Sequence, residues 1–220
     1  MRTLLIGSKN YSSWSLRPWI FLRKARFEFT EQIVHFDESG YQAQIAALSP
    51  SRRVPLLIDA GVKIWDSLAI CEYAAESTGR GLPLDRIARA RARSIAAEMH
   101  SGFQVLRDEC PMNVRARNLH VPLTPGLQAD VARIDEIWSG CREEYGGGWL
   151  FGEFSIADAM FAPVFFRFQS YGASLSPASQ TYLNHALQDP DLRDWQDAAS
   201  QEGHPLLHVD RLGASETVRV

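Results

Sequence analysis

The stretch Tyr11–Trp19, YSSWSLRPW, follows a short apolar run at 3–7 and opens a segment with helical spacing. The hydroxyls of Ser12, Ser13 and Ser15 therefore gather where a predicted strand ends and a predicted helix begins. The N-terminus of a helix favours an anion, because its N–H groups are unpaired and the helix dipole is positive there. A serine at the same place can also simply cap the helix. The sequence of this turn leaves both interpretations open.

The segments on either side of this turn alternate in type. Strand patterns occur at residues 2–7, 27–36 and 54–66, the last with a hairpin signal at Asp59-Ala60-Gly61. Helical spacing occurs between and after them, at residues 14–25, 41–48 and 67–77. The predicted order is therefore strand, helix, strand, helix, strand, strand, helix, which makes a small α/β domain over residues 1–78.

From residue 85 onward only helical patterns occur. They cover residues 85–110, 124–145, 155–172, 176–188 and 190–200. Ser155 and Asp158 have the spacing of a capping box at the start of the third of these. The sequence thus predicts a linker at 79–85, an all-helical domain at 86–203 and a tail at 204–220 that lacks a helical period.

The composition excludes several classes of protein. Of the 220 residues, 45% are hydrophobic and 22% charged, which is typical of a globular protein, and the formal net charge of −3 favours no nucleic-acid partner. No apolar run approaches the roughly 20 residues that span a bilayer, and the apolar part of the N-terminus is too short for a signal peptide. The three cysteines are widely spaced, so we expect reduced thiols, no metal site and a cytoplasmic location.

Two dipeptides in the first domain carry further chemistry. Val54-Pro55 precedes a strand, and a cis bond there would turn the main chain of Val54 outward toward an extended ligand, whereas a trans bond would place it in an ordinary loop. Asp66-Ser67 precedes a helix, and the pair can cap that helix or receive the ammonium and carboxylate of an amino-acid ligand. Each dipeptide taken alone is a weak signal.

In combination, these features resemble the glutathione transferase superfamily over nearly the whole chain. The segment SSWSLR at 12–17 is similar to the serine-serine-cysteine-x-x-arginine signature of the zeta class. The segment PSRRVPLLI at 50–58 looks like the usual proline-x-glycine-lysine-valine-proline segment of the superfamily, with Arg53 in place of the lysine. The closest likeness is to serine-type, zeta-like bacterial glutathione transferases. The resemblance implies an α/β plus all-α fold, with an N-terminal thioredoxin-like domain followed by the all-helical C-terminal domain of these transferases.

The resemblance also implies which residues act on glutathione, the expected co-substrate. Its sulfur would receive a hydrogen bond from Ser12 or Ser13, because the signature can be registered on either serine, with Ser12 slightly favoured and Tyr11 a weaker rival. Arg17 of the same signature can be structural or functional. The rest of the tripeptide would be held by Arg53, Val54, Pro55, Asp66 and Ser67.

The sequence indicates the binding residues for the second, electrophilic substrate less clearly. Candidates for its pocket are Asn10, Met99, Phe103 and Arg107, although the helical spacing of Met99 and Phe103 fits core packing equally well. The likeness to the zeta class also breaks at two places. Trp14 stands where the signature has cysteine, and Ser170 stands where zeta isomerases of maleylacetoacetate carry an arginine, the nearest one here being Arg167. Both changes disfavour that isomerisation.

The resemblance therefore implies an enzyme, a glutathione transferase that activates the glutathione thiolate with a serine hydroxyl. The thiolate would attack small electrophiles, as in detoxification, or reduce organic peroxides. A glutathione-dependent isomerase of the zeta type is one alternative, and a non-catalytic module that binds partner proteins is another. The polar turn, Val54-Pro55 and Asp66-Ser67 favour an enzyme over the binding module. A homodimer is expected from the resemblance, with neither a nucleic-acid nor a membrane partner.

Overall fold

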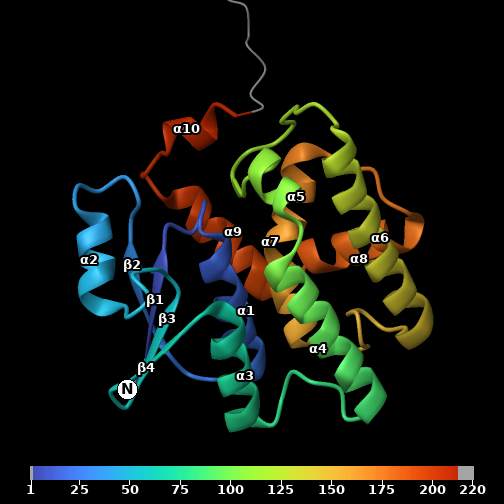
Figure 1. Cartoon of the computed structure of the whole chain (residues 1–220), viewed down its shortest axis with the longest axis horizontal. Helices are drawn as coiled ribbons and strands as arrows, with labels where there is room; N and C mark the ends of the chain where they lie inside the picture. The colour runs from blue at the N-terminus through green and yellow to red at the C-terminus, as the bar shows by residue number, and fades with distance from the viewer. Residues whose placement is uncertain (1, 213–220) are drawn as a thin grey trace, which may run out of the picture.

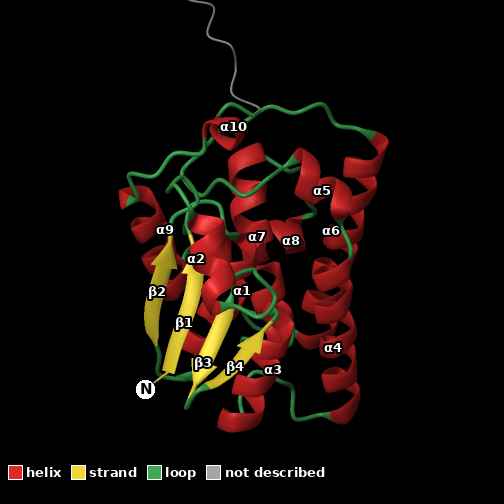
Figure 2. Cartoon of the chain, turned by 60° about the vertical axis from the view of Figure 1, so that its left-hand side comes forward, coloured by secondary structure: helices red, strands yellow, loops and turns green. Residues whose placement is uncertain are grey.

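The four strands form one mixed sheet in the order β2-β1-β3-β4 (Figure 2). In the computed structural model, which describes residues 2–212, they are β1 (Arg2–Gly7), β2 (Thr30–Val34), β3 (Leu56–Asp59) and β4 (Val62–Trp65). Strand β1 pairs in parallel with β2 and antiparallel with β3, and β3 pairs antiparallel with β4. The strand expected at 27–36 is thus shorter than its sequence pattern, but the order of elements is the predicted one.

Three helices cover the two faces of this sheet. They are α1 (Ser13–Ala25), α2 (Tyr41–Leu48) and α3 (Ser67–Thr78). Side chains alternate along a strand, so Leu4 and Ile6 of β1 join the main core formed with α1 and α3, whereas Leu5 packs with Ile45 of α2 on the opposite face. This layering brings the N-termini of α1 and α3 to the same end of the sheet as the loop before β3.

Most of the remaining described helices are grouped around one central helix (Figure 1). Their bounds are α4 (Arg86–Ser101), α5 (Gln104–Glu109), α6 (Pro125–Tyr145), α7 (Ile156–Tyr171), α8 (Pro177–Leu187), α9 (Pro190–Gln201) and α10 (Leu207–Asp210). Helix α7 contacts both α1 and α4, and it is buried continuously from Ile156 to Phe168. The α/β plus all-α fold class predicted from the sequence is therefore confirmed.

The predicted capping box at the start of α7 is also confirmed. Asp158 is fully buried, and its carboxylate accepts hydrogen bonds from the main-chain N–H groups of Leu150 and Ser155 at 2.9 and 2.8 Å. It also accepts from the hydroxyls of Ser155 and Tyr182 at 2.7 Å each. One carboxylate thus joins the loop before α7, the first turn of α7 and the helix α8.

The structure differs from the sequence-based expectation in two places. The single helix expected over 85–110 is wrong: it breaks at Gly102-Phe103, where Phe103 has a positive φ of 60° and α5 begins. The tail expected at 204–220 contains the short helix α10, and its residues 213–220 lie outside the described part of the chain. Within residues 2–212 no helix is both long and apolar enough to cross a membrane.

Candidate functional site

Two serines occupy the start of α1, and neither hydroxyl caps it. Ser12 is at the N-cap position, but its Oγ donates to Ser15 Oγ at 2.7 Å, which in turn accepts from the Gly7 N–H at 3.1 Å. Ser13 is 8% exposed, and its hydroxyl has no hydrogen-bond partner among the described residues. Simple helix capping is therefore not the role of either side chain.

Two adjoining cavities meet at this turn. The smaller, of about 240 Å³, is lined by Arg53, Val54, Pro55, Asp66 and Ser67 together with Trp14, Ser51 and Trp65. The larger, of about 490 Å³, is lined by Ser12, Ser13 and residues from three other segments. Trp14, Arg53 and Val54 belong to both linings, so the two hollows form one continuous cleft. The structure thus gathers the residues that the sequence proposed for glutathione.

The N-terminus of α3 supplies a carboxylate and a hydroxyl to the smaller cavity. Asp66 caps the helix by accepting from the N–H groups of Leu68 and Ala69, which is one of the two roles that the sequence left open. Its carboxylate also lies 3.2 Å from His100 Nε2, and that hydrogen bond lowers the pKa of Asp66. Ser67 is 1% exposed, and its buried Oγ has no partner within the described residues. Such a hydroxyl is costly unless a ligand satisfies it.

The main chain before β3 is similarly open to a ligand. The Val54-Pro55 peptide bond is cis, one of the two forms that the sequence left open. No main-chain or side-chain group within the described residues forms a hydrogen bond with the N–H or C=O of Val54. Main-chain groups usually find a partner, so those of Val54 can pair with an extended peptide in the cleft.

Tyr11 lines the larger cavity, but its hydroxyl is bound to the C-terminal segment and to Arg115. Its hydroxyl donates to Asp210 Oδ2 at 2.8 Å and accepts from the N–H of Leu206 and from Arg115 Nη2 at 2.9 and 2.8 Å. Burial raises the pKa of this phenol. With its hydrogen-bonding capacity used in this way, Tyr11 has no proton to offer a ligand thiolate.

The residues that the sequence proposed for the second substrate lie elsewhere. Asn10 is fully buried and donates from Nδ2 to Asn113 Oδ1 at 2.8 Å. Met99 and Phe103 belong to the main core, and Arg107 donates to the carbonyls of Gly102 and Met99. None of the four lines either cavity of the cleft.

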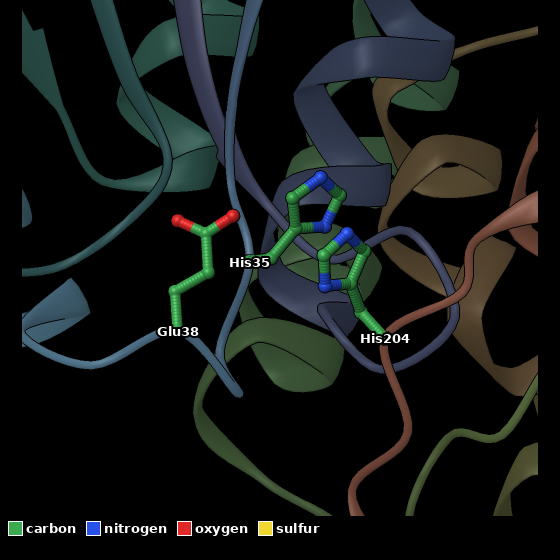
Figure 3. A group of neighbouring side chains, drawn as sticks. All are labelled: His35, Glu38 and His204. Carbon is green, nitrogen blue, oxygen red and sulfur yellow. The ribbon is translucent and has the colours of Figure 1, made fainter.

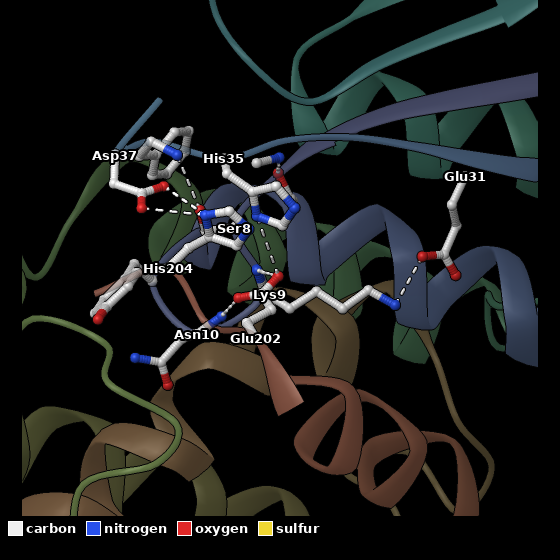
Figure 4. A network of polar contacts seen from close by, with 12 residues as sticks. Ser8, Lys9, Asn10, Glu31, His35, Asp37, Glu202 and His204 are labelled. Atoms are coloured by element: carbon white, nitrogen blue, oxygen red, sulfur yellow. Dashed lines mark hydrogen bonds and ion pairs between the residues drawn. The ribbon is translucent and has the colours of Figure 1, made fainter. Parts of the chain in front are cut away.

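The sequence missed the residues that do form the outer wall of the larger cavity, namely Phe36, Tyr41, Leu206 and His208. The last two reach the cleft because the C-terminal segment returns over the β1–α1 turn (Figure 4). Glu202 anchors it, accepting from the N–H groups of Lys9 and Asn10 at 2.7 and 3.0 Å. Contacts across more than 190 residues leave no periodic signal in the sequence.

One group of side chains could in principle hold a metal ion. His35, Glu38 and His204 bring potential ligand atoms within 4.8 Å of one another (Figure 3). The two imidazoles, however, are stacked 3.7 Å apart at 11°, and His204 Nδ1 is hydrogen-bonded to Asp37 at 2.9 Å. Lone pairs that lie in two parallel ring planes do not converge on one ion. The group instead ties the C-terminal segment to the loop after β2.

Behind the serines lies an unusual cation. Arg17 is fully buried, and none of its three guanidinium nitrogens has a hydrogen-bond partner within residues 2–212. The ring of Trp14 packs against it, with the ring centroid 4.2 Å from the guanidinium carbon. Burial, together with the charges of Arg107 and Arg167, holds the pKa of Arg17 well below its usual value.

A mixed sheet that offers the N-termini of two helices to one cleft, followed by an all-helical domain, defines a two-domain thioredoxin-like protein. Family models for the N-terminal and the C-terminal domain of glutathione S-transferases match residues 11–77 and 113–208. The chain belongs to the glutathione S-transferase superfamily and is a glutathione-dependent enzyme. The resemblance inferred from the sequence is thereby confirmed.

Individual relatives place it near the zeta class. Rat maleylacetoacetate isomerase is 27% identical over 184 residues, which cover 80% of this chain and 82% of the relative. A glutathione transferase homolog from Burkholderia, solved with bound glutathione, has a TM-score of 0.68 at 22% identity and covers 91% of this chain and 99% of its own. A diazinon-metabolizing transferase of the silkworm has a TM-score of 0.70 at 18% identity, covering 90% and 97%. These two structures share the fold.

Proposed function

We propose that this enzyme is a serine-type glutathione transferase that binds the tripeptide along the cleft. The unpartnered, buried hydroxyl of Ser67 carries the proposal, because it lines the smaller cavity with its donor unused and can therefore donate to the γ-glutamyl carboxylate. Asp66 faces the adjacent ammonium, and the open main chain of Val54 pairs with the cysteinyl residue. Arg53, which lines both cavities, reaches the glycyl carboxylate. The sulfur then lies at the serines of the β1–α1 turn.

The chemical task at that turn is to keep the sulfur ionised. A thiol of pKa about 8.5 needs about 2.7 kcal/mol of preference for the anion to titrate two units lower. A charge-assisted hydrogen bond supplies roughly 1.5–3 kcal/mol and a helix N-terminus roughly 0.3–1 kcal/mol. One seryl hydroxyl at the start of α1 is therefore sufficient.

We assign that hydroxyl to Ser12, with Ser15 as its positioning residue. Hydroxyl hydrogens rotate, so the Ser12–Ser15 pair can reverse when an anion binds. Ser15, which accepts from Gly7 N–H, would then donate to Ser12, and Ser12 would donate to the sulfur. A chain of hydrogen bonds of this kind polarises its last member. Ser13, on the same turn, is the competing donor.

The larger cavity is the place for the second substrate. Its aromatic and aliphatic wall, formed by Phe36, Tyr41 and Leu206, suits an apolar electrophile or an organic peroxide. The names of the relatives favour a second candidate, glutathione-dependent isomerisation. Ser170, however, is fully buried and donates to the carbonyl of Asn113, so this position offers no cation to an acidic substrate. Transfer to an electrophile is therefore the first proposal, in an enzyme that we expect to be a homodimer.

Substitution of Ser67 tests glutathione binding directly. Ser67→Ala is expected to weaken glutathione binding about 10- to 100-fold, because one hydrogen bond to a charged group is lost. The change removes no hydrogen bond within the described protein, so its melting temperature should not fall. Isothermal titration calorimetry measures the affinity. Ser77→Ala on the same helix, where the hydroxyl donates to the Tyr73 carbonyl, is the matched control. Equal affinities in both variants would refute the binding mode.

Replacement of Arg17 separates its two possible roles. Arg17→Met removes a buried charge without a partner, so the free energy of unfolding is expected to rise by about 1–4 kcal/mol. The same change removes a positive charge one helical turn behind the serines, so the thiol pKa of bound glutathione is expected to rise. Chemical denaturation and ultraviolet titration measure the two effects, with Arg23→Met on exposed α1 surface as the control. A stabilised variant with an unchanged thiol pKa would make Arg17 purely structural.

A further inference from the structure

One contact joins the helical domain to the smaller cavity of the cleft. Helix α4 packs against α3, and the last turn of α4 carries His100. The Nε2 atom of this histidine lies 3.2 Å from Oδ2 of Asp66, the residue that caps α3. His100 itself belongs to the lining of neither cavity of the cleft, so it can act on a ligand there only through Asp66.

An aromatic neighbour from the first domain holds the ring of His100. Trp14, which lines both cavities, packs edge-on against this ring, with the two centroids 5.4 Å apart and an interplanar angle of 77°. The second ring nitrogen of His100, Nδ1, is buried and has no hydrogen-bond partner among residues 2–212. Within the described protein, the imidazole therefore directs its polar contact at Asp66.

The two carboxylate oxygens of Asp66 have separate partners. Oδ1 accepts from the N–H groups of Leu68 and Ala69 at 2.9 and 3.3 Å, whereas Oδ2 faces His100. A carboxylate held at one oxygen can still turn about its last bond, because that torsion is soft, but one held at both oxygens cannot. The main chain of Asp66 also has a positive φ of 76°, a strained conformation of the kind found at functional sites. Side chain and main chain are thus both fixed before a ligand binds.

Although it is fixed, Asp66 remains open to a cation in the cleft. Its side chain is 44% exposed and lines the smaller cavity, and an ionised carboxylate has more acceptor positions than these partners use. The contact with His100 also lowers the pKa of Asp66, which favours the ionised form. A binding group that is already immobile loses little conformational freedom when its ligand arrives, and this raises the affinity.

We infer that His100 is a positioning residue for glutathione, which holds the carboxylate of Asp66 where the γ-glutamyl ammonium binds. The inference rests on the function proposed above and adds to it a residue of the helical domain that does not touch the tripeptide. It also gives a role to Trp14, which stands where the zeta signature has cysteine, because the indole holds the imidazole from the side of α1. The effect of His100 is confined to ligands that carry the γ-glutamyl amino group.

Calorimetric titration of the full chain with glutathione, and with glutaryl-cysteinylglycine as the analogue without the amino group, tests the inference. His100→Leu should weaken glutathione about 2- to 10-fold, the effect of having to immobilise one side chain on binding, and leave the analogue unchanged. His100→Gln keeps an N–H donor and should restore most of the affinity. In turnover, His100→Leu should raise the KM for glutathione without lowering kcat, since the serines are untouched. The control is His185→Leu, at a ring that packs edge-on against Trp149 and lines neither cavity.

A second measurement needs no glutathione. The pKa of Asp66, followed by NMR of its carboxyl carbon, should rise in His100→Leu and stay low in His100→Gln, because only the leucine removes the donor. An unchanged Asp66 pKa, an unchanged affinity for glutathione or equal weakening of both peptides in His100→Leu would overturn the inference and leave the proposed function standing. If the unaltered chain binds no glutathione, the proposed function fails and the inference with it. Should His100→Leu not fold, His100→Asn, whose amide is one bond shorter than that of glutamine, replaces it with the same expected results.

Discussion

Ser12→Ala is expected to raise the thiol pKa of bound glutathione by about one to two units, because a hydrogen bond of roughly 1.5–3 kcal/mol to the anion is lost. Turnover at neutral pH should fall about 3- to 25-fold, in proportion to the thiolate that remains. The affinity for glutathione should change little, since Ser67 and Val54 hold the rest of the tripeptide. Ultraviolet titration of bound glutathione measures the pKa, and turnover with a small aromatic electrophile measures the rate.

Two neighbouring variants make this test specific. Ser15→Ala removes the partner that orients Ser12 and should cause an intermediate rise in thiol pKa, whereas Ser13→Ala should cause a small one. The loss of rate in Ser12→Ala should also shrink as the pH is raised above the thiol pKa. If Ser13→Ala carries the large shift and Ser12→Ala does not, Ser13 is the donor. If neither shifts the pKa, seryl activation is wrong.

Asp158→Ala is expected to lower the free energy of unfolding by about 3–5 kcal/mol, since it leaves buried groups without their charged partner. The carboxylate is fully buried and accepts four hydrogen bonds, from two main-chain N–H groups and from the hydroxyls of Ser155 and Tyr182. It holds the first turn of α7, on which both domains pack. Urea denaturation followed by circular dichroism measures the loss.

The control for this variant is a helix-capping aspartate that is exposed to solvent instead of buried. Asp85 caps α4 at an exposed position by accepting from the N–H groups of Ile87 and Ala88. Asp85→Ala should cost only about 1 kcal/mol, the usual value for a solvent-exposed cap. A loss in Asp158→Ala no larger than that of Asp85→Ala would show that burial of the network adds nothing to the stability.

Local patterns in the sequence were sufficient for the fold class. Strand alternation, helical spacing and the hairpin at Asp59-Ala60-Gly61 gave the order of elements in the first domain, and the Ser155–Asp158 spacing gave the start of α7. These features depend on residues a few positions apart, so they can be recognised in the amino-acid sequence without the structure. The break at Gly102-Phe103 was missed, because helical residues continue on both sides of it.

The site was predicted only in part, and for the same physical reason. Ser12, Ser13, Val54, Asp66 and Ser67 line the cleft, and the sequence could propose them because each lies at the start of a helix or just before a strand, where main-chain groups are unpaired. Two partners of Tyr11, Leu206 and Asp210, and the wall formed by Leu206 and His208 come from a segment nearly 200 residues away.

The sequence by itself determined the elements, their order and the polar groups that end them, since these follow from contacts between near neighbours in the chain. The tertiary structure alone decided which of those polar groups have no hydrogen-bond partner in the described protein. Whether a buried hydroxyl, main chain or guanidinium is satisfied depends on atoms brought in from distant segments. For that reason only the folded molecule shows that Ser67 and Arg17 lack partners among the described residues, and that the hydroxyl of Tyr11 is fully hydrogen-bonded.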